Sequence, residues 1–196
     1  MKANKIILAL AIFIIISTLS YFLYSWLLPS YDLNYRSKAE QNILSKLIDN
    51  DQAFEENTTF GDAVFTSDVL QYIRDGMPGL EENTLADFLQ ANNQPYPLKD
   101  YLPTNRNYFF LGNSDTNLYY NDWRSFSSKY PGLLIVESFS RAGFNRSLTQ
   151  ALVLKSSHAR LFDEPFEYSG SGLLCFFRRI GTIWILQNQL VVSIMG

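Results

Sequence analysis

The strongest constraint on this chain is an almost unbroken apolar run of 23 residues, from Ile6 to Leu28. Lys2 and Lys5 precede the run, and no acidic residue lies before it or within it. A helix of this length extends about 34 Å, at about 1.5 Å per residue, and the hydrocarbon core of a bilayer is about 30 Å thick. We therefore expect residues 1–28 to form an N-terminal membrane anchor, with a transmembrane helix over residues 6–28.

A cleaved secretory signal peptide and a buried core helix are the alternatives to an anchor. The apolar run is longer than the core of a signal peptide, which has about 7 to 15 residues, and Tyr21, Tyr24 and Trp26 are bulky where a cleavage site needs small residues. Aromatic residues at this position are typical of the interfacial end of a membrane-spanning helix. Because so long an apolar run is unusual in a soluble core, the sequence favours an uncleaved signal anchor.

The charges on the two sides of the apolar run indicate its orientation. Lys2, Lys5 and the terminal amine lie on the short side without an acidic residue, so the positive-inside rule leaves the N-terminus in the cytoplasm. Arg36 and Lys38 weaken this contrast, because they lie near the other end. We expect a single-pass protein of the cell membrane whose C-terminal domain lies outside, in the periplasm if the cell is Gram-negative.

The part after the anchor is acidic and contains one cysteine. Without residues 1–28 the chain loses two basic residues and no acidic one, so its formal charge changes from −3 to −5. A nucleic-acid partner is excluded on this basis, because the sequence offers no basic stripe to bind phosphates. Cys175 lies among apolar residues and is expected to be buried, and a single cysteine cannot form a disulfide within the chain.

Helix signals dominate the first half of the exported part. Ser37 and Glu40 match the capping box, in which two side chains bind the free amides at a helix start, and predict a helix over residues 37–48. The apolar face of this helix consists of Ala39, Ile43, Leu44, Leu47 and Ile48. Four further elements are expected: a short strand over Phe60–Phe65, a helix over Ser67–Arg74 capped by Ser67, a helix beginning at Thr84, and an irregular, packed connection over Pro95–Tyr120.

Strand signals dominate the second half, after one helix predicted over residues 121–128. Runs rich in Val, Ile, Phe and Leu predict strands over residues 133–140, 149–155, 173–178 and 182–194. Ile180-Gly181 predicts a hairpin between the last two, because glycine adopts the positive φ of a tight turn. In the last strand one face is expected to hold Trp184, Leu186, Leu190, Val192 and Ile194. Asn188 interrupts this face, and we interpret it as a satisfied buried amide, a bulge or a polar group in a pocket, in that order.

Together these elements predict an α+β fold. After the transmembrane helix we expect a connector over residues 29–36 and one domain over residues 37–196. In this domain the helices pack on one face of a mainly antiparallel sheet that ends in a C-terminal hairpin. The length of the domain suits a single core.

A series of short motifs runs along the domain: Trp123-Arg124-Ser125-Phe126, Tyr130-Pro131-Gly132, the turn Ser140-Arg141-Ala142-Gly143-Phe144-Asn145, and the strand Thr149-Gln150-Ala151-Leu152-Val153. This series resembles an uncharacterised family of small bacterial proteins that are exported or membrane-anchored. Ser169-Gly170-Ser171-Gly172 and Trp184 are similar to that family's closing elements, and the resemblance extends over about residues 37–196. Ala142 and Leu154 depart from the family's usual Val and aromatic residue. The resemblance implies a fold but no activity, because the function of the family is unknown.

Four polar residues are candidate contacts for a ligand or a partner: Arg141, Asn145, Gln150 and Asn188. If they converge at one end of the sheet, they could bind a carboxylate, a phosphate or a peptide backbone. The alternative is a structural turn at Gly143-Phe144-Asn145, in which Gly and Asn adopt left-handed backbone angles and Phe144 fills the sheet end.

Signatures of catalysis are sparse. His158 is the only histidine, so a multi-histidine metal site within one chain is excluded, and we interpret His158 as an exposed loop residue. Ser171 lies between two glycines, but a nucleophile elbow needs a strand-to-helix turn, and a strand is predicted to follow. No catalytic residue, metal ligand or cofactor site is predicted.

Three classes of function follow from these observations. The leading hypothesis is a membrane-anchored, exported domain that binds another macromolecule, such as a protein of the cell envelope, without catalysis. The alternative is a small-ligand-binding module that uses the four polar residues. A hydrolase using Ser171 or His158 is the least favoured, because the motifs around both residues are weak and fold alone does not imply function.

Overall fold

The computed structural model describes residues 33–48, 53–58, 65–102, 109–159 and 169–192. The predicted anchor over residues 6–28 and all but the last residue of the predicted strand over Phe60–Phe65 lie outside these ranges. The chain divides into two compact units, residues 1–36 and 37–196, and the sheet lies in the second. None of the helices within the described ranges is both long and apolar enough to span a bilayer.

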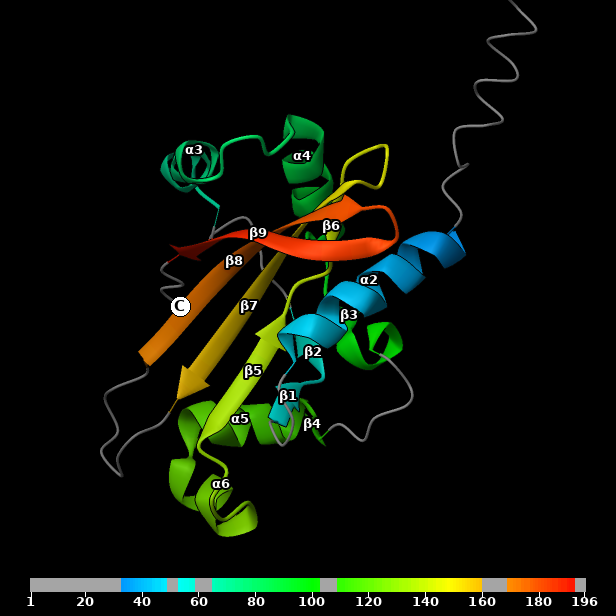
Figure 1. The fold of residues 1–196 in the computed structure, drawn as a ribbon. Coiled ribbons are helices and arrows are strands. Elements are labelled where there is room, and N and C mark those ends of the chain that lie inside the picture. The colour runs from blue at the N-terminus through cyan, green and yellow to red at the C-terminus, as the bar shows by residue number, and fades with distance from the viewer. Residues whose placement is uncertain (1–32, 49–52, 59–64, 103–108, 160–168, 193–196) are drawn as a thin grey trace, which may run out of the picture. The chain divides into compact units, whose positions relative to one another are not determined.

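The described helices and strands are labelled in Figure 1. The helices are α2 (Leu33–Leu47), α3 (Ser67–Gly76), α4 (Glu82–Ala91), the short 3₁₀ helix η1 (Leu98–Tyr101), α5 (Asn113–Asn121) and α6 (Trp123–Lys129). The strands are β1 (Ala53–Glu55), β2 (Asn57–Thr58), β3 (Tyr96–Pro97), β4 (Phe109–Leu111), β5 (Ile135–Phe139), β6 (Gly143–Phe144), β7 (Gln150–Ala159), β8 (Ser169–Ile180) and β9 (Ile183–Val192).

The main sheet has the strand order β4-β1-β5-β7-β8-β9, and the short β6 also pairs with β7. β1 is parallel to both β4 and β5, while the pairs from β5 to β9 are antiparallel. β2 and β3 form a separate antiparallel pair. The prediction of an α+β fold with a mainly antiparallel sheet is confirmed, and the sheet is mixed. The four strands predicted for the second half are β5, β7, β8 and β9.

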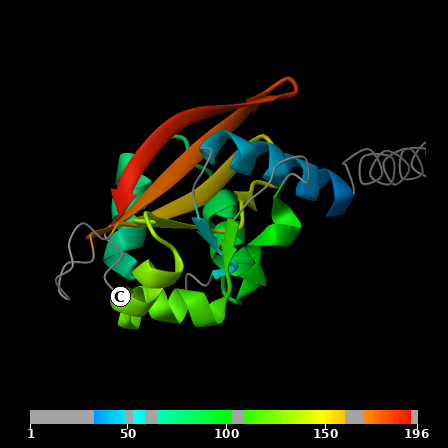
Figure 2. The same ribbon diagram turned by 90° about the horizontal axis from the view of Figure 1, so that it is seen from below.

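Helices cover both faces of the sheet, so the prediction that they cover one face is wrong. Successive residues of β7 point to opposite faces: Ala151 and Val153 pack with apolar residues of α2, while Leu152 and Leu154 pack with those of α3 and α4. Figures 1 and 2 show α2 on one side of the sheet and α3 and α4 on the other. A strand that is apolar at consecutive positions needs cover on both faces. Cys175 of β8 is buried in this core, as predicted.

A third apolar cluster lies where α5 and α6 meet the end of the sheet that holds β1 and β5. Its buried residues are Ala53, Leu111, Tyr119, Phe126 and Val136. Most of α5 lies within the stretch that was predicted to be an irregular, packed connection, so the prediction of irregularity is wrong, while the prediction of packing is confirmed by buried residues such as Leu111 and Tyr119. The Tyr119 hydroxyl donates to the backbone carbonyl of His158 at 2.7 Å, and such a tertiary contact leaves no local pattern in the sequence.

Helix α2 has the predicted apolar face, but it begins four residues before the predicted start. Ala39, Ile43, Leu44 and Ile48 are buried, and Leu47 packs against them. The capping-box prediction is wrong, because Ser37 and Glu40 lie inside the helix. The buried Glu40 carboxylate instead accepts hydrogen bonds from the backbone N–H of Ala142 at 2.8 Å and from Arg141 Nη2 at 3.3 Å.

Other helix starts differ from prediction by one or two residues. Thr66, rather than Ser67, is the N-cap of α3, and its hydroxyl accepts from the N–H of Val69 at 3.5 Å. Helix α4 begins at Glu82, before the predicted start at Thr84. The helix predicted over residues 121–128 is confirmed as α6.

The C-terminal hairpin is confirmed, but its last strand changes face along its length. Gly181 takes a φ of +62° in the turn. Phe177 pairs with Leu186 and Phe176 pairs with Asn188, so one extra residue, Gln187, forms a bulge. As a result Trp184 packs on the α2 face and Val192 on the α3 face. The prediction of one shared face is wrong, and Ile194 lies outside the described residues.

Candidate functional site

Asn145 and Gln150 lie together at one end of the sheet. Asn145 Oδ1 accepts from the backbone N–H groups of Thr149 at 2.7 Å and Gln150 at 2.9 Å. Asn145 Nδ2 donates to the carboxylate of Glu81 and to the Thr149 hydroxyl, both at 2.9 Å. The buried amide of Asn145 thus closes the turn before β7 and attaches it to the start of α4.

The Gln150 side chain caps α4 from a distant strand. Its Oε1 accepts from the backbone N–H of Glu81 at 2.9 Å and from the Thr84 hydroxyl at 3.2 Å. Its Nε2 donates to the carbonyl of Gly79 at 2.9 Å. Because the N-cap residue Glu81 makes no capping bond with its own side chain, Gln150 satisfies a free amide at the helix start.

Arg141 has a different set of partners. Its guanidinium donates to the buried Glu40 of α2 and lies 4.3 Å from the centre of the Tyr101 ring. Its backbone N–H donates to Asn92 Oδ1 at 2.7 Å, and its carbonyl accepts from Asn92 Nδ2 at 3.0 Å. Beside this pair, burial and the negative charge of Glu40 raise the pKa of Tyr96 well above its usual value.

Asn188 is bonded to helix α3. Its Nδ2 donates to the carbonyl of Gly76 at 2.6 Å, and its Oδ1 accepts from the backbone N–H of Gln189 at 2.8 Å. Asn188 is half-buried and directly follows the bulged Gln187. Two of its three interpretations, a satisfied amide and a bulge, therefore apply together.

The structure brings two of the four predicted contact residues together. Asn145 and Gln150 meet at Glu81, whereas Arg141 binds α2 and Asn188 binds α3. Each of the four side chains holds a helix or a helix end in place around strands β7 to β9. These bonds fit a structural role in positioning the helices.

The turn at Gly143 needs glycine for close packing rather than for a left-handed backbone. A Cβ at this position would overlap the backbone N and Cα and the side-chain Cβ of Phe88 in α4. The positive φ in this region belongs to Leu148, at 52°. Phe144 is buried and packs against Trp184, in agreement with the structural alternative.

His158 lies on strand β7, so its interpretation as a loop residue is wrong. Its Nε2 lies 3.1 Å from the hydroxyl of the buried Ser156, and its ring meets the ring of Tyr120 edge to face at 5.5 Å. Burial lowers the pKa of His158. The Tyr120 hydroxyl donates to Glu55 at 2.7 Å, and burial raises the pKa of this carboxyl in spite of that bond.

Neither candidate hydrolase residue has the setting of a nucleophile and its base. Ser171 lies within strand β8, where its backbone pairs with Ser157, and not at a strand-to-helix turn. The hydroxyl that His158 contacts belongs to Ser156, which is fully buried. Within the described residues no group of three or more His, Cys, Asp and Glu side chains is arranged to hold a metal ion.

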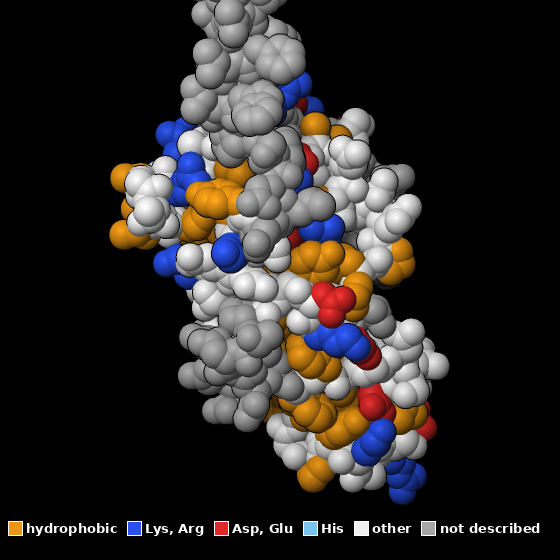
Figure 3. Space-filling view, turned by 90° about the vertical axis from the view of Figure 1, so that its right-hand side faces the viewer, with side chains coloured by type: hydrophobic (Ala, Val, Ile, Leu, Met, Phe, Trp, Pro, Cys, Tyr) orange, Lys and Arg blue, Asp and Glu red, His pale blue; other side chains and the backbone are white. Residues whose placement is uncertain are grey.

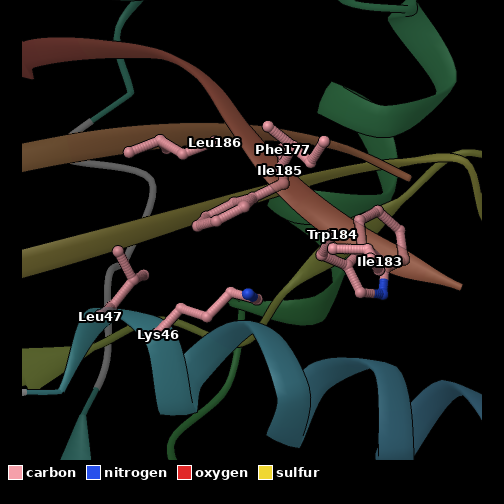
Figure 4. Close-up of a pocket in the computed structure, with 7 residues that line it drawn as sticks. All are labelled: Lys46, Leu47, Phe177, Ile183, Trp184, Ile185 and Leu186. Atoms are coloured by element: carbon pink, nitrogen blue, oxygen red, sulfur yellow. The ribbon is translucent and has the colours of Figure 1, made fainter. Parts of the chain in front are cut away.

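The described part of the chain has a groove between α2 and β9. It encloses a cavity volume of about 430 Å³. Helix α2 contributes Lys46 and Leu47, strand β8 contributes Phe177, and β9 contributes residues 183–186. Figure 4 shows the side chains of Lys46 and Leu47 rising from the helix toward those of the strands.

Two apolar side chains on the α2 face of β9 are exposed, Leu186 in the lining of this groove and Val191 further along the strand. On the α2 face, Trp184 is buried, but Leu186 is 41% exposed and Val191 is 62% exposed. Sequence reasoning missed this site, because it placed the apolar residues of β9 on one buried face. Gln187 and Asn188, which interrupt the apolar run, were the available signal of a bulge.

Comparisons with known proteins found no match among family models, curated proteins or solved structures. The resemblance to small exported bacterial proteins therefore stays a prediction.

Proposed function

We propose that this chain is a single-pass membrane protein whose domain over residues 37–196 lies in the cell envelope and binds a protein partner there. The anchor is the apolar run over residues 6–28, with the N-terminus in the cytoplasm. The observation that carries the binding role is the apolar groove between α2 and β9, whose lining includes the exposed Leu186. Val191, further along the same face of β9, is exposed as well.

The position of β9 supports this role. Among the described strands β9 is at one end of the sheet order, so its outer edge faces no other described strand. Edge strands are usually protected by charged residues, proline or a covering segment. β9 holds ten residues, Ile-Trp-Ile-Leu-Gln-Asn-Gln-Leu-Val-Val, with neither a charge nor a proline. An uncharged edge of this kind suits the addition of a strand from another protein.

The chemistry of the groove indicates what the partner segment contains. An extended segment paired with β9 would direct every second side chain toward the groove, where Phe177, Trp184 and Leu186 offer apolar contacts. Lys46 lies on the opposite wall and is exposed. We therefore infer an extended, apolar segment that carries an acidic residue opposite Lys46.

A photo-crosslinking experiment in cells tests this proposal. A photoreactive residue at Val191 of the full chain is expected to cross-link to another envelope protein, and the matched control at Ser128, on the exposed side of α6, is expected not to. Leu186→Asp should abolish the Val191 cross-link, because a carboxylate would be buried against the apolar side chains of the partner segment. Lys46→Glu should weaken it through repulsion of the acidic residue.

The same experiment separates the competing hypotheses. If the chain is recovered cross-linked only to a second copy of itself, the proposal that the partner is another protein is contradicted. The groove would then be a site of self-association. A small apolar ligand is the second candidate, because the volume of the groove lies within the range of about 300–1,000 Å³ for ligand pockets. In that case no protein cross-link should form, and a bound small molecule should be extracted from the purified chain but not from its Leu186→Asp variant.

A further inference from the structure

The turn of the β8–β9 hairpin exposes two large apolar side chains next to basic ones. Ile180 is 63% exposed and Ile183 is 60% exposed, on either side of the turn residues Gly181 and Thr182. Arg178 and Arg179 come directly before Ile180, and Arg178 is exposed while its Nη2 donates to the carbonyl of Gly79 at 3.1 Å. Two isoleucines held together in water at the tip of a hairpin indicate a contact surface.

The loop before β7 carries another basic residue and meets the hairpin near this turn. The backbone N–H of Arg179 donates to the carbonyl of Thr149 at 2.8 Å, so the loop before β7, with its exposed Arg146, is adjacent to the hairpin. Glu81, which is close to this loop, is bonded to Asn145 within the domain. The tip therefore combines apolar and positively charged groups, although the exported part as a whole is acidic.

The turn of the β8–β9 hairpin and the N-terminal part of α2 lie at the same end of the domain over residues 37–196. Figures 1 and 2 show the turn and the first residues of α2 within this unit pointing the same way. Figure 3 views the molecule from this end, and Lys and Arg side chains lie among hydrophobic ones in its upper half. The turn therefore lies at the end of the domain where the domain is joined to the preceding residues of the chain.

The length of the connecting chain limits how far this end can lie from a membrane. The five steps from Leu28 to Leu33 span at most about 18 Å when fully extended. The helical stretch from Leu33 to Ser37 adds about 6 Å. Ser37 therefore lies within about 24 Å of the end of the apolar run.

We propose that the β8–β9 turn contacts the membrane surface, with Ile180 and Ile183 inserted among the lipids and the arginines bound to anionic phospholipid headgroups. Apolar groups flanked by basic side chains bind anionic bilayers in two ways: the apolar groups are buried among the lipids, and the basic side chains are attracted to the anionic headgroups. This inference rests on the anchor in the proposed function. It gives the domain two points of attachment, which fixes the orientation of the groove relative to the membrane.

A fluorescent probe on the turn tests this contact. The full chain, with Cys175→Ala to remove the native thiol and Thr182→Cys labelled with an environment-sensitive dye, is reconstituted into vesicles of phosphatidylcholine and phosphatidylglycerol. We expect blue-shifted emission from the turn and strong quenching by brominated lipid. A matched probe at Ser128→Cys on α6 should show neither change. Ile180→Asp should abolish the signal at position 182 while the midpoint of urea unfolding changes little, because Ile180 is exposed and does not line the groove.

Carbonate extraction of the same vesicles reports the anchor alone, and release of the chain would contradict the proposed function. If the chain resists extraction and the turn probe stays unquenched, the membrane contact of the hairpin is overturned. Equal quenching in vesicles of phosphatidylcholine alone would overturn the recognition of anionic headgroups.

Discussion

Gly143 sets the distance between strand β6 and helix α4. It lies so near the backbone of Phe88 that a side chain at this position has no room. The backbone of a helix cannot move aside as a flexible side chain can, so the contact fixes the position of α4.

Gly143→Ala is expected to lower the free energy of unfolding by about 1–3 kcal/mol, the usual cost of overpacking a core. The control is Gly112→Ala, where an added Cβ would lie 3.7 Å from the nearest atom, a Glu56 carboxylate oxygen, in ordinary contact. Urea unfolding of both variants measures the difference. Equal stabilities of the two variants would contradict the close approach of β6 to α4.

The buried imidazole of His158 links stability to pH. Burial holds its pKa in the folded chain below the ordinary value of 6.5, so as the pH drops the unfolded chain takes up the proton first. The free energy of unfolding should therefore fall as the pH drops below 6.5, and this loss should stop once the folded His158 is also protonated.

Urea unfolding of the wild type and of His158→Gln, from pH 8 to pH 5, measures this effect as the difference between the two curves. Glu55 contributes with the opposite sign, because burial raises its pKa and a raised carboxyl pKa adds stability as the pH falls. Since Glu55 is present in both proteins, its contribution cancels. Parallel curves would show that His158 has the same pKa in the folded and unfolded chain.

At the scale of elements, the bulge at Gln187 decides which core each half of β9 joins. Before it, Trp184 packs against the residues of α2, and after it, Leu190 and Val192 pack against those of α3. If Gln187 took a place in the regular alternation of the strand instead of forming a bulge, Leu190 and Val192 would point away from α3.

Insertion of one alanine after Asn188 should therefore cost about 3 kcal/mol or more of unfolding free energy, because Leu190 and Val192 would turn out of the core beneath α3. Deletion of Gln187 should cost far less, because it joins Leu186 directly to Asn188 and keeps the pairs of both residues with β8. The length-preserving control Gln187→Ala should change stability by no more than about 0.5 kcal/mol, since this residue is exposed. Hydrogen exchange of the α3 amides gives the local measurement. Unchanged α3 protection in the insertion variant would contradict the role of the bulge.

Strand β9 also illustrates which parts of the fold could be predicted from the sequence and which could not. The strong apolar patterns predicted α2, the hairpin and the strands of the second half, because each depends on local periodicity. The face of Leu190 and Val192 was missed, because a single extra residue reverses every later side chain. Helix α5 was missed because its burial of Tyr119 depends on β5 and β7, which are distant in sequence.

The candidate site was predictable to a smaller degree. The sequence singled out Asn145 and Gln150 as polar residues near one end of the sheet, but their partners Glu81 and Gly79 lie far earlier in the chain. The groove arises only when α2 packs beside β9, and no local pattern contains that contact. Exposure of an apolar residue is a property of the assembled domain.

At the scale of the whole molecule, the proposed anchor and the core of the domain are formed by different residues. The three apolar clusters belong to residues 39–192, so the described core needs no part of the apolar run. Helix α2 begins at Leu33, which makes residues 1–32 the longest N-terminal segment that can be removed without cutting this helix.

A chain lacking residues 1–32 is expected to leave the membrane fraction on carbonate extraction and to unfold in one cooperative transition, because its core is intact. The full-length control carries Ile14→Arg and Ile15→Arg, which cost about 2.5–3.5 kcal/mol each at the centre of a spanning helix, and it should also lose its resistance to extraction. A wild-type product shortened near residue 28 would identify a cleaved signal peptide instead of an anchor. If the truncated chain stayed in the membrane fraction, the domain alone would hold it there, and the apolar run would not be the attachment on which the proposed function depends.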